Sequence, residues 1–198
     1  MYALVESGTI TKYFNHPKGF TLGDLQYPAD IFMKWSVAEK EAIGIHEVVF
    51  DNSNFKNDQW YNNTNQSFAF ADGIVTASYG TATPKAHADR NGTDRDGVEL
   101  NPIVVIEGLK TKLIKNLKAQ VAGILAETDW YISRNTEKST AIPSSVSTHR
   151  DAVRTKQAAM ETAITNAADT AALETLHTYT TTDGVQSRPL GELPVLES

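Results

Sequence analysis

Residues 109–125 read LKTKLIKNLKAQVAGIL, and this stretch decides the fold expected for the second half of the chain. Leucine or valine recurs every four residues, and two isoleucines widen the same stripe: Leu109, Leu113, Ile114, Leu117, Val121, Ile124 and Leu125. This spacing is typical of an amphipathic helix, because residues three or four apart share one face. We therefore predict a helix that starts near residue 106.

Two more helices and an extended tail are expected after this one. A serine pair directly after Pro143 favours a helix start, and Asp169 favours the N-terminal cap of a third, short helix. Residues 128–143 would connect two long helices into an antiparallel hairpin, because each apolar face needs a partner. Glycine and proline recur from residue 178 onward, so the tail should be extended.

The first 80 residues predict a small, mainly antiparallel β module. Aromatic and β-branched side chains favour strands at residues 2–5, 9–14, 45–50 and 74–79. Glycine and proline between residues 15 and 27 predict a loop there.

Local motifs add one helix and two turns to this module. Ser36 and Glu39 have the spacing of a capping box, and Gly44 is placed to end the short helix that follows. Residues 59–61 and 67–71 are expected to pair as a hairpin across the Asn-rich turn at 62–65. Asp72-Gly73 predicts a tight turn before the last strand.

The sequence thus predicts an α+β fold in four parts. Residues 1–80 form the β-rich N-terminal module with one short helix. Residues 81–105 show no periodicity and are expected to be a linker or surface loop. Residues 106–177 form a helical module built as an α-helical hairpin, and residues 178–198 form the extended tail.

Charge and composition narrow the function. The formal net charge is −6, and none of the 198 residues is cysteine. Disulfides, thiolate zinc sites and cysteine nucleophiles are therefore excluded, and nucleic acid is disfavoured because phosphate binding relies on clustered basic side chains. No apolar run approaches the roughly 20 residues that cross a bilayer. We expect neither a membrane span nor a secretion signal.

The sequence contains no motif for catalysis or for a cofactor. Its five histidines are scattered without metal-ligand spacing, and there is no Gly-rich phosphate loop or nucleophile elbow. Asp94, Asp96 and Gly97 fit the third, fifth and sixth positions of a calcium loop, but Gly92 and Ile103 stand where oxygen ligands are needed. We predict no catalytic residue, no cofactor and no metal.

Residues 125–161 carry an ordered set of residue types. A leucine precedes a Thr-Asp-Trp step, an arginine, a glutamate, an Ile-Pro corner and a helix with paired arginines: Leu125, Thr128-Asp129-Trp130, Arg134, Glu137, Ile142-Pro143, Arg150 and Arg154. This set resembles the helical C-terminal module of bacteriophage tail-fibre assembly proteins and tail assembly chaperones. The likeness covers about residues 108–177. It implies a protein that assists the assembly of tail fibres or forms a small structural part of the tail.

The same residues also suggest a partner-binding surface. Trp130 is suited to a helix–helix corner, and we expect Arg134 and Arg150 to pair with Glu137 or Asp129. One partner helix cannot cover so wide an apolar stripe, and an uncovered apolar patch is typical of an interface. The residues predicted to bind a partner are Leu109, Leu113, Leu117, Val121, Ile124, Trp130 and Arg134.

We therefore expect a non-enzymatic bacteriophage tail protein that acts through protein–protein contacts, as a structural part of the tail, baseplate or fibre or as a tail-fibre assembly chaperone. Its partners would be other phage tail or fibre proteins in a homo- or hetero-oligomer, with no nucleic acid and no membrane. It would act in the host cytoplasm during assembly or remain in the virion tail. The alternative is a receptor- or carbohydrate-binding module of a tail fibre, suggested by Trp60, Tyr61, Phe68, Phe70 and Tyr79, although most of these rings should fill the core.

Overall fold

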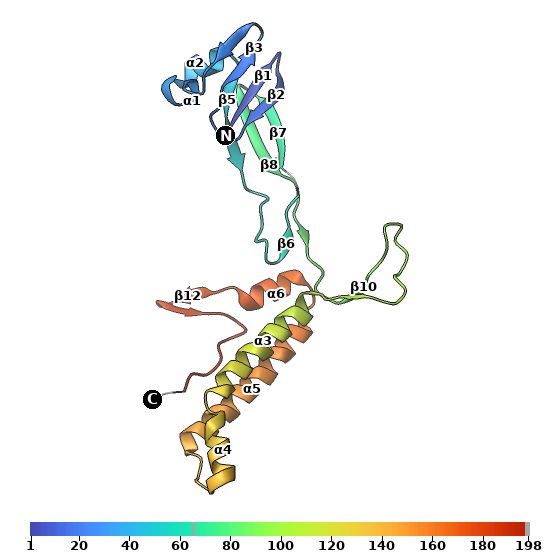
Figure 1. Ribbon diagram of the computed structural model, residues 1–198, viewed down its shortest axis with the longest axis vertical. Helices are drawn as coiled ribbons and strands as arrows, with labels where there is room; N and C mark the ends of the chain where they lie inside the picture. Colours follow the sequence, from blue (N-terminus) through green and yellow to red (C-terminus); the bar gives the residue numbers. More distant parts are fainter. Residues whose placement is uncertain (65, 197–198) are drawn as a thin grey trace. The chain divides into compact units, whose positions relative to one another are not determined.

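The computed structural model describes residues 1–64 and 66–196, which divide into two compact units, Met1–Thr83 and Pro84–Ser198. Figure 1 colours the first unit from blue to green and the second from green to red. Residue 65 of the expected Asn-rich turn and residues 197–198 of the expected tail lie outside the described part.

A curled five-stranded sheet forms the centre of the first unit. Its strands, in spatial order, are β2 (Thr9–Phe14), β1 (Tyr2–Glu6), β5 (Ile45–Asp51), β8 (Ile74–Tyr79) and β7 (Gln66–Ala71). Neighbouring strands are antiparallel except β5 and β8, which run parallel. The sheet curls far enough to bring its two edges together, since the rings of Tyr13 on β2 and Phe68 on β7 lie 4.6 Å apart.

Each of the two faces of this sheet carries a buried cluster. Helices α1 (Ile31–Lys34) and α2 (Val37–Ala42) and the hairpin of β3 (Phe20–Leu22) and β4 (Leu25–Tyr27) accompany one of them. The buried cluster there is aromatic-rich: Leu4, Phe14, Phe20, Ile31, Phe32 and Ile45. The other cluster is smaller: Ala3, Val5, Val48, Val75 and Ala77, with Phe68 and Phe70 packed against it. Side chains alternate between the faces because successive residues of a strand point to opposite sides.

Several local predictions for this unit are confirmed. The expected strands appear as β1, β2, β5 and β8, and Ser36 and Glu39 form the complete capping box of α2. Gly44 follows that helix with φ +79°. Asp72 and Gly73, both at positive φ, make the tight turn between β7 and β8. These features depend on residues close in sequence, which is why the sequence could predict them.

The predicted pairings and loop of this unit are partly wrong. Residues 15–27 contain the β3–β4 hairpin instead of only a loop. Residues 59–61 do not pair with 67–71: β7 pairs with β8, and β6 (Tyr61–Asn62) pairs with β9 (Thr83–Pro84). The tight turn at Asp72 sends β8 back between β7 and β5, which makes the β5–β8 pair parallel. Alternating hydrophobicity predicts which side chains face the core, but it does not specify a strand's neighbours.

Two long helices lying along one another form the body of the second unit (Figure 1): α3 (Leu109–Ala126) and α5 (Ser144–Asn166). Helix α4 (Asp129–Lys138) connects them, and α6 (Thr170–His177) follows, capped by the Asp169 carboxylate on the Ala172 amide. The buried apolar residues of the four helices are Leu117, Val121, Val146, Val153, Met160, Ile164 and Leu173.

Short β elements flank these helices. Strands β10 (Arg90–Asn91) and β11 (Val105–Ile106) form an arm that extends away from α3 (Figure 1). Asp89, at the base of the arm, accepts hydrogen bonds from the Gly108 amide and the Thr111 hydroxyl and so closes the start of α3. These two bonds lower the pKa of Asp89. Strands β12 (Thr180–Thr182) and β13 (Val185–Ser187) make a second hairpin after α6.

The predicted fold class is wrong. The described residues form a mixed α/β structure with six helices spread over both units, not a β module followed by a C-terminal helical hairpin. The first unit contains two helices instead of one, and residues 129–138, expected to be a connection, form α4. Residues 180–187 of the expected extended tail form a hairpin. Amphipathic periodicity is weak in segments this short, because two or three turns are too few to define a face.

Candidate partner-binding site

The corner between α3 and α4 is fixed by one arginine of α5. Arg150 Nη1 donates to the carbonyl oxygen of Leu125 at 2.7 Å and to Thr128 Oγ1 at 2.6 Å. Arg150 Nη2 lies 2.9 Å from Asp129 Oδ1. The Thr128 hydroxyl in turn donates to the Leu125 carbonyl at 3.0 Å. A single guanidinium thus binds the last turn of α3, the connecting residue and the first residue of α4.

Burial makes this corner rigid. Arg150 is 7% exposed and Thr128 3% exposed. A buried polar group without a partner costs about 1–3 kcal/mol, and a buried charge costs more. The Leu125 carbonyl, the Thr128 hydroxyl and the Asp129 carboxylate together satisfy the guanidinium, so the direction in which α4 leaves α3 is specified by hydrogen bonds.

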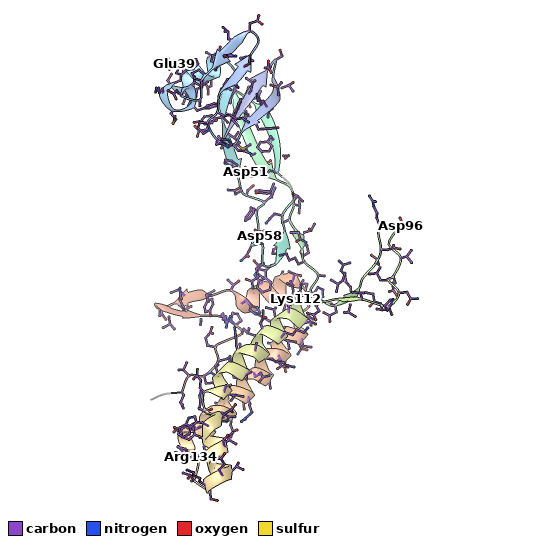
Figure 2. The ribbon with its side chains drawn as sticks, in the orientation of Figure 1. Glu39, Asp51, Asp58, Asp96, Lys112 and Arg134 are labelled. Carbon is purple, nitrogen blue, oxygen red and sulfur yellow. The ribbon has the colours of Figure 1, made fainter. Side chains whose placement is uncertain are left out.

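Helix α4 presents an aromatic cluster at this corner. Trp130 is 51% exposed, and its ring lies 3.8 Å from the ring of Tyr131. The guanidinium carbon of Arg134 lies 4.6 Å from the Trp130 ring centroid and 5.3 Å from that of Tyr131. Figure 2 labels Arg134 on α4, near the end of the unit where this helix is found. We call Trp130, Tyr131 and Arg134 the α4 cluster.

The charge of Arg134 is not neutralised within the described part of the chain. Its Nε atom is buried without a hydrogen-bond acceptor, and no carboxylate forms an ion pair with its guanidinium. The expected pairing of Arg150 with Asp129 is confirmed, whereas the side chain of Arg134 pairs with neither Glu137 nor Asp129. The α4 cluster therefore combines an exposed indole with a cation that lacks a counter-charge.

A second aromatic–arginine pair in the same unit has the opposite property. The guanidinium carbon of Arg188 lies 5.1 Å from the ring centroid of Tyr179. Arg188 also binds both carboxylate oxygens of Glu192, at 2.8 and 2.9 Å, and the Tyr179 hydroxyl donates to Glu192 at 2.6 Å. The Arg188 guanidinium is thus paired with a carboxylate of the same chain. The α4 cluster differs from it by lacking the carboxylate.

The apolar stripe of α3 is mostly used inside the second unit. Leu117 and Val121 are buried, at 5% and 3% exposure. Leu109, Leu113 and Ile124 are half-buried. Of the residues predicted to bind a partner, only Trp130 on α4 is highly exposed, and Arg134 is half-buried beside it. The partner-binding role of the stripe stays a prediction, and the α4 cluster is the more accessible surface.

Sequence reasoning did not include Tyr131 or the buried Arg150 corner among the site residues. Tyr131 directly follows Trp130, but one side chain of an adjacent pair normally turns to the core of a helical unit. The Arg150–Asp129 pair was expected, but the bonds of Arg150 to Leu125 and Thr128 were not, because only folding brings Arg150 to residues more than 20 positions earlier in the chain.

In the acidic segment that partly fits a calcium loop, carboxylates accept hydrogen bonds from nearby residues of the same segment. Asp94 Oδ1 accepts hydrogen bonds from the amides of Asp96 and Val98 at the tip of the arm, and Glu99 accepts one from the Asn91 side chain. Across residues 1–64 and 66–196, no three histidine or acidic side chains lie close enough together to hold a metal ion. Within the same ranges, no helix is both long and apolar enough to cross a membrane.

The aromatic side chains that suggested a sugar-binding module are buried or half-buried residues of the first unit. Trp60 and Tyr61 are 3% and 6% exposed, and Phe68 and Phe70 pack against the smaller cluster of the sheet. Sugar stacking needs an accessible ring face, which buried rings do not offer.

Comparison with known proteins gives no match: no family model, no curated protein and no solved structure is similar to this chain. Its function is therefore inferred from its own residues.

Proposed function

We propose that this chain is a non-enzymatic bacteriophage tail protein that binds other tail or fibre proteins through the α4 cluster. The family comes from the likeness of residues 108–177 to the helical module of tail-fibre assembly proteins and tail assembly chaperones. The α4 cluster is proposed as the binding surface because of its exposure and its chemistry. The observation that carries it is the exposed Trp130 beside the uncompensated guanidinium of Arg134.

The chemistry of the α4 cluster suits a protein partner. Tryptophan, tyrosine and arginine are the residues most enriched among those that dominate interface energies, and all three occur here within five residues of sequence. A rigid helix reduces the entropy lost on binding, and the Arg150 corner holds α4 in place. The surface therefore needs little rearrangement before it binds.

The missing counter-charge defines what the partner should offer. Guanidinium groups bind carboxylates strongly, and Arg188 shows the arrangement completed inside this chain by Glu192. We expect the partner to place an Asp or Glu carboxylate on Arg134 and apolar surface on Trp130. The partner would then complete on α4 the arrangement that Glu192 completes at Tyr179.

Photo-crosslinking in infected cells tests this proposal. The photoreactive residue p-benzoylphenylalanine replaces Trp130 in one variant and Tyr179 in a matched control, since each of these rings is 51% exposed and has an arginine over it. We expect crosslinks from position 130 to a tail or fibre protein and none from position 179. Crosslinks of equal yield from both positions, or none from position 130, would contradict the assignment of the surface.

Mass spectrometry of purified virions separates the two roles that remain open. A stoichiometric copy number indicates a structural part of the tail, whereas absence from virions together with crosslinks during assembly indicates a chaperone. A chain that is absent from virions and forms no crosslink to a tail protein is not a tail protein.

A further inference from the structure

The arm that carries β10 and β11 exposes an apolar run, which we define as residues 103–106 (Figure 1). All four residues are β-branched, and they are 41–63% exposed: Ile103, Val104, Val105 and Ile106. Successive residues of a strand point to opposite faces, so the described chain packs neither face of the run into a core. Soluble proteins avoid three or four consecutive exposed apolar residues unless they serve a function.

One edge of the apolar run also has free backbone groups. The Gly92 amide donates to the Val104 carbonyl at 2.7 Å, so Val104 directs its backbone groups toward the first strand of the arm. Those of Ile103 and Val105 point to the opposite, open edge, because successive residues of a strand alternate in direction. Within residues 1–64 and 66–196, Ile103 makes no backbone hydrogen bond. An open edge of this kind can pair with another strand.

The arm is fixed at both ends, so its open edge is presented in a defined direction. At the base, the first two amides of α3 donate to carbonyls that precede the arm, Leu109 to Ala86 at 2.9 Å and Lys110 to His87 at 3.0 Å. At the tip, the Asp94 carboxylate accepts hydrogen bonds from two backbone amides. An edge that is already ordered loses little entropy when it pairs.

We propose that the arm pairs with the arm of a second copy of this chain. The two apolar runs lie antiparallel about a two-fold axis at Val104, and Ile103 of each copy exchanges backbone hydrogen bonds with Val105 of the other. Only these two residues of the run direct their backbone groups at the open edge, which sets this register. Every cross-strand pair then consists of two β-branched side chains, which stabilise an antiparallel ribbon. The interface uses the same surface on both copies and therefore closes as a dimer.

Charge favours a second copy as the occupant of this edge. The chain runs from an acidic tip, through the apolar run, to the lysine-rich start of α3. Antiparallel pairing therefore brings the tip of each arm toward the α3 start of the other copy. Asp96 at the tip and Lys112 on α3, both labelled in Figure 2, are exposed and form no ion pair within the described residues. Each Asp96 is thus placed to pair with Lys112 of the other copy.

This dimer does not depend on the phage-tail proposal. The arm precedes α3 and the α4 cluster follows it, so the two surfaces lie at opposite ends of that helix. Loss of one surface leaves the other intact.

Engineered cysteines test the register, because the chain has none of its own. Val104→Cys places two thiols opposite each other at the axis, where Cα atoms of a pair without hydrogen bonds are about 4.5 Å apart, within disulfide range. Val98→Cys is the matched control, since Val98 is 62% exposed on the same arm but lies far from the axis. After mild oxidation, we expect a covalent dimer of the full-length chain for Val104→Cys and a monomer for Val98→Cys. Equal cross-linking of both variants, or none at position 104, would overturn the proposal.

Sedimentation velocity of the full-length chain tests the dimer without cross-linking. We expect a monomer–dimer equilibrium for the wild type. Val104→Asp should abolish the dimer, because it places two like charges at the axis, whereas Val98→Asp should leave it unchanged. Both side chains are exposed, and circular dichroism verifies that the variants stay folded. A wild type that is monomeric at its highest soluble concentration, or a dimer that survives Val104→Asp, rejects this interface.

Charge reversal tests why the occupant is a second copy. Lys112→Glu should raise the dissociation constant of the dimer about tenfold, because two symmetric ion pairs are lost. Combining it with Asp96→Lys should restore the wild-type value. Lys138→Glu is the matched control, since Lys138 is exposed at the end of α4. Equal weakening by Lys112→Glu and Lys138→Glu, or no recovery in the double variant, would reject the contact between tip and α3 and with it the antiparallel dimer.

Discussion

The two units place their aromatic side chains in opposite environments. In the first unit, the rings of Phe14, Phe20 and Phe32 lie 5.0–6.0 Å apart inside the core, and Trp60 is 3% exposed. In the second unit, Trp130 is 51% exposed on a helix that buries none of its residues. A buried ring contributes to stability through the apolar area removed from water, whereas an exposed ring is available to another molecule. The comparison separates structural aromatic residues from candidate binding residues.

Within the described chain, buried polar and charged side chains are more numerous in the second unit than in the first. Among the described residues of the first unit, Lys40 is the only buried charged or polar residue, and its ammonium lies over the Tyr2 ring. The second unit buries Thr128, His149, Arg150 and Thr170. Arg150 and Thr128 bind each other, and the Thr170 hydroxyl donates to the carbonyl oxygen of Lys85. The second unit is therefore held partly by specific hydrogen bonds, and it contains the candidate partner-binding site.

The largest effect is expected from truncating a ring in the first unit. Phe14→Ala should lower the free energy of unfolding of that unit by about 3–5 kcal/mol, because a fully buried phenylalanine leaves a cavity. Hydrogen exchange resolved by segment would locate the loss. We expect faster exchange in β1, β2 and β5 and little change in α3 and α5. Equal loss of protection in both units would mean that their stabilities are not separable.

A smaller loss is expected when the polar corner of the second unit is broken. Arg150→Ala should lower the free energy of unfolding by about 2 kcal/mol, because the Leu125 carbonyl and the Thr128 hydroxyl lose their buried donor. Exchange should rise most in α4. The control is Arg154→Ala, since Arg154 is exposed on the same helix and should change stability by less than about 0.5 kcal/mol. Unchanged exchange in α4 would show that the corner does not hold this helix.

An intermediate effect with a defined pH dependence is expected at the capping box of α2. Ser36→Ala should cost about 1 kcal/mol at neutral pH, the usual effect of losing an N-terminal cap. Hydrogen bonds from the hydroxyl and amide of Ser36 also lower the pKa of Glu39. The ionised carboxylate therefore stabilises the fold at a pH above the ordinary pKa of a glutamate. This contribution is lost as the pH falls through the lowered pKa of Glu39. The stability gap between wild type and variant, measured by urea unfolding, should therefore narrow in acid; a constant gap contradicts this assignment.

The smallest effect on stability is expected from the exposed ring of the second unit. Trp130→Ala should change the free energy of unfolding by less than about 0.5 kcal/mol, because the side chain is half in water and α4 is fixed by Arg150. Trp60→Ala, a matched change at a buried ring, should cost about 3–5 kcal/mol. Urea unfolding followed by circular dichroism measures both. Similar losses for the two variants would remove the distinction between core and surface aromatics.

The accuracy of the sequence predictions depends on how local their causes are. The capping box at Ser36, the turn at Asp72-Gly73, the cap at Asp169 and the start of α5 after Pro143 were all predicted, and the structure contains them. Each arises from residues within a few positions of one another. The β3–β4 hairpin and α4 were missed, because segments of three to ten residues are too short to show a periodic pattern.

The sequence by itself determined the absence of cysteine chemistry, the capping box of α2, the tight turn at Asp72-Gly73, the cap at Asp169 and the start of α5 after Pro143. Only the tertiary structure decided that β8 lies parallel to β5, that Leu117 and Val121 are buried, and that Arg150 reaches the corner at Thr128. It also decided that the described residues supply no counter-charge to Arg134. The physical reason is that capping and turn formation act over a few neighbouring residues. Burial and hydrogen-bond satisfaction depend instead on groups that are distant in sequence and meet only on folding.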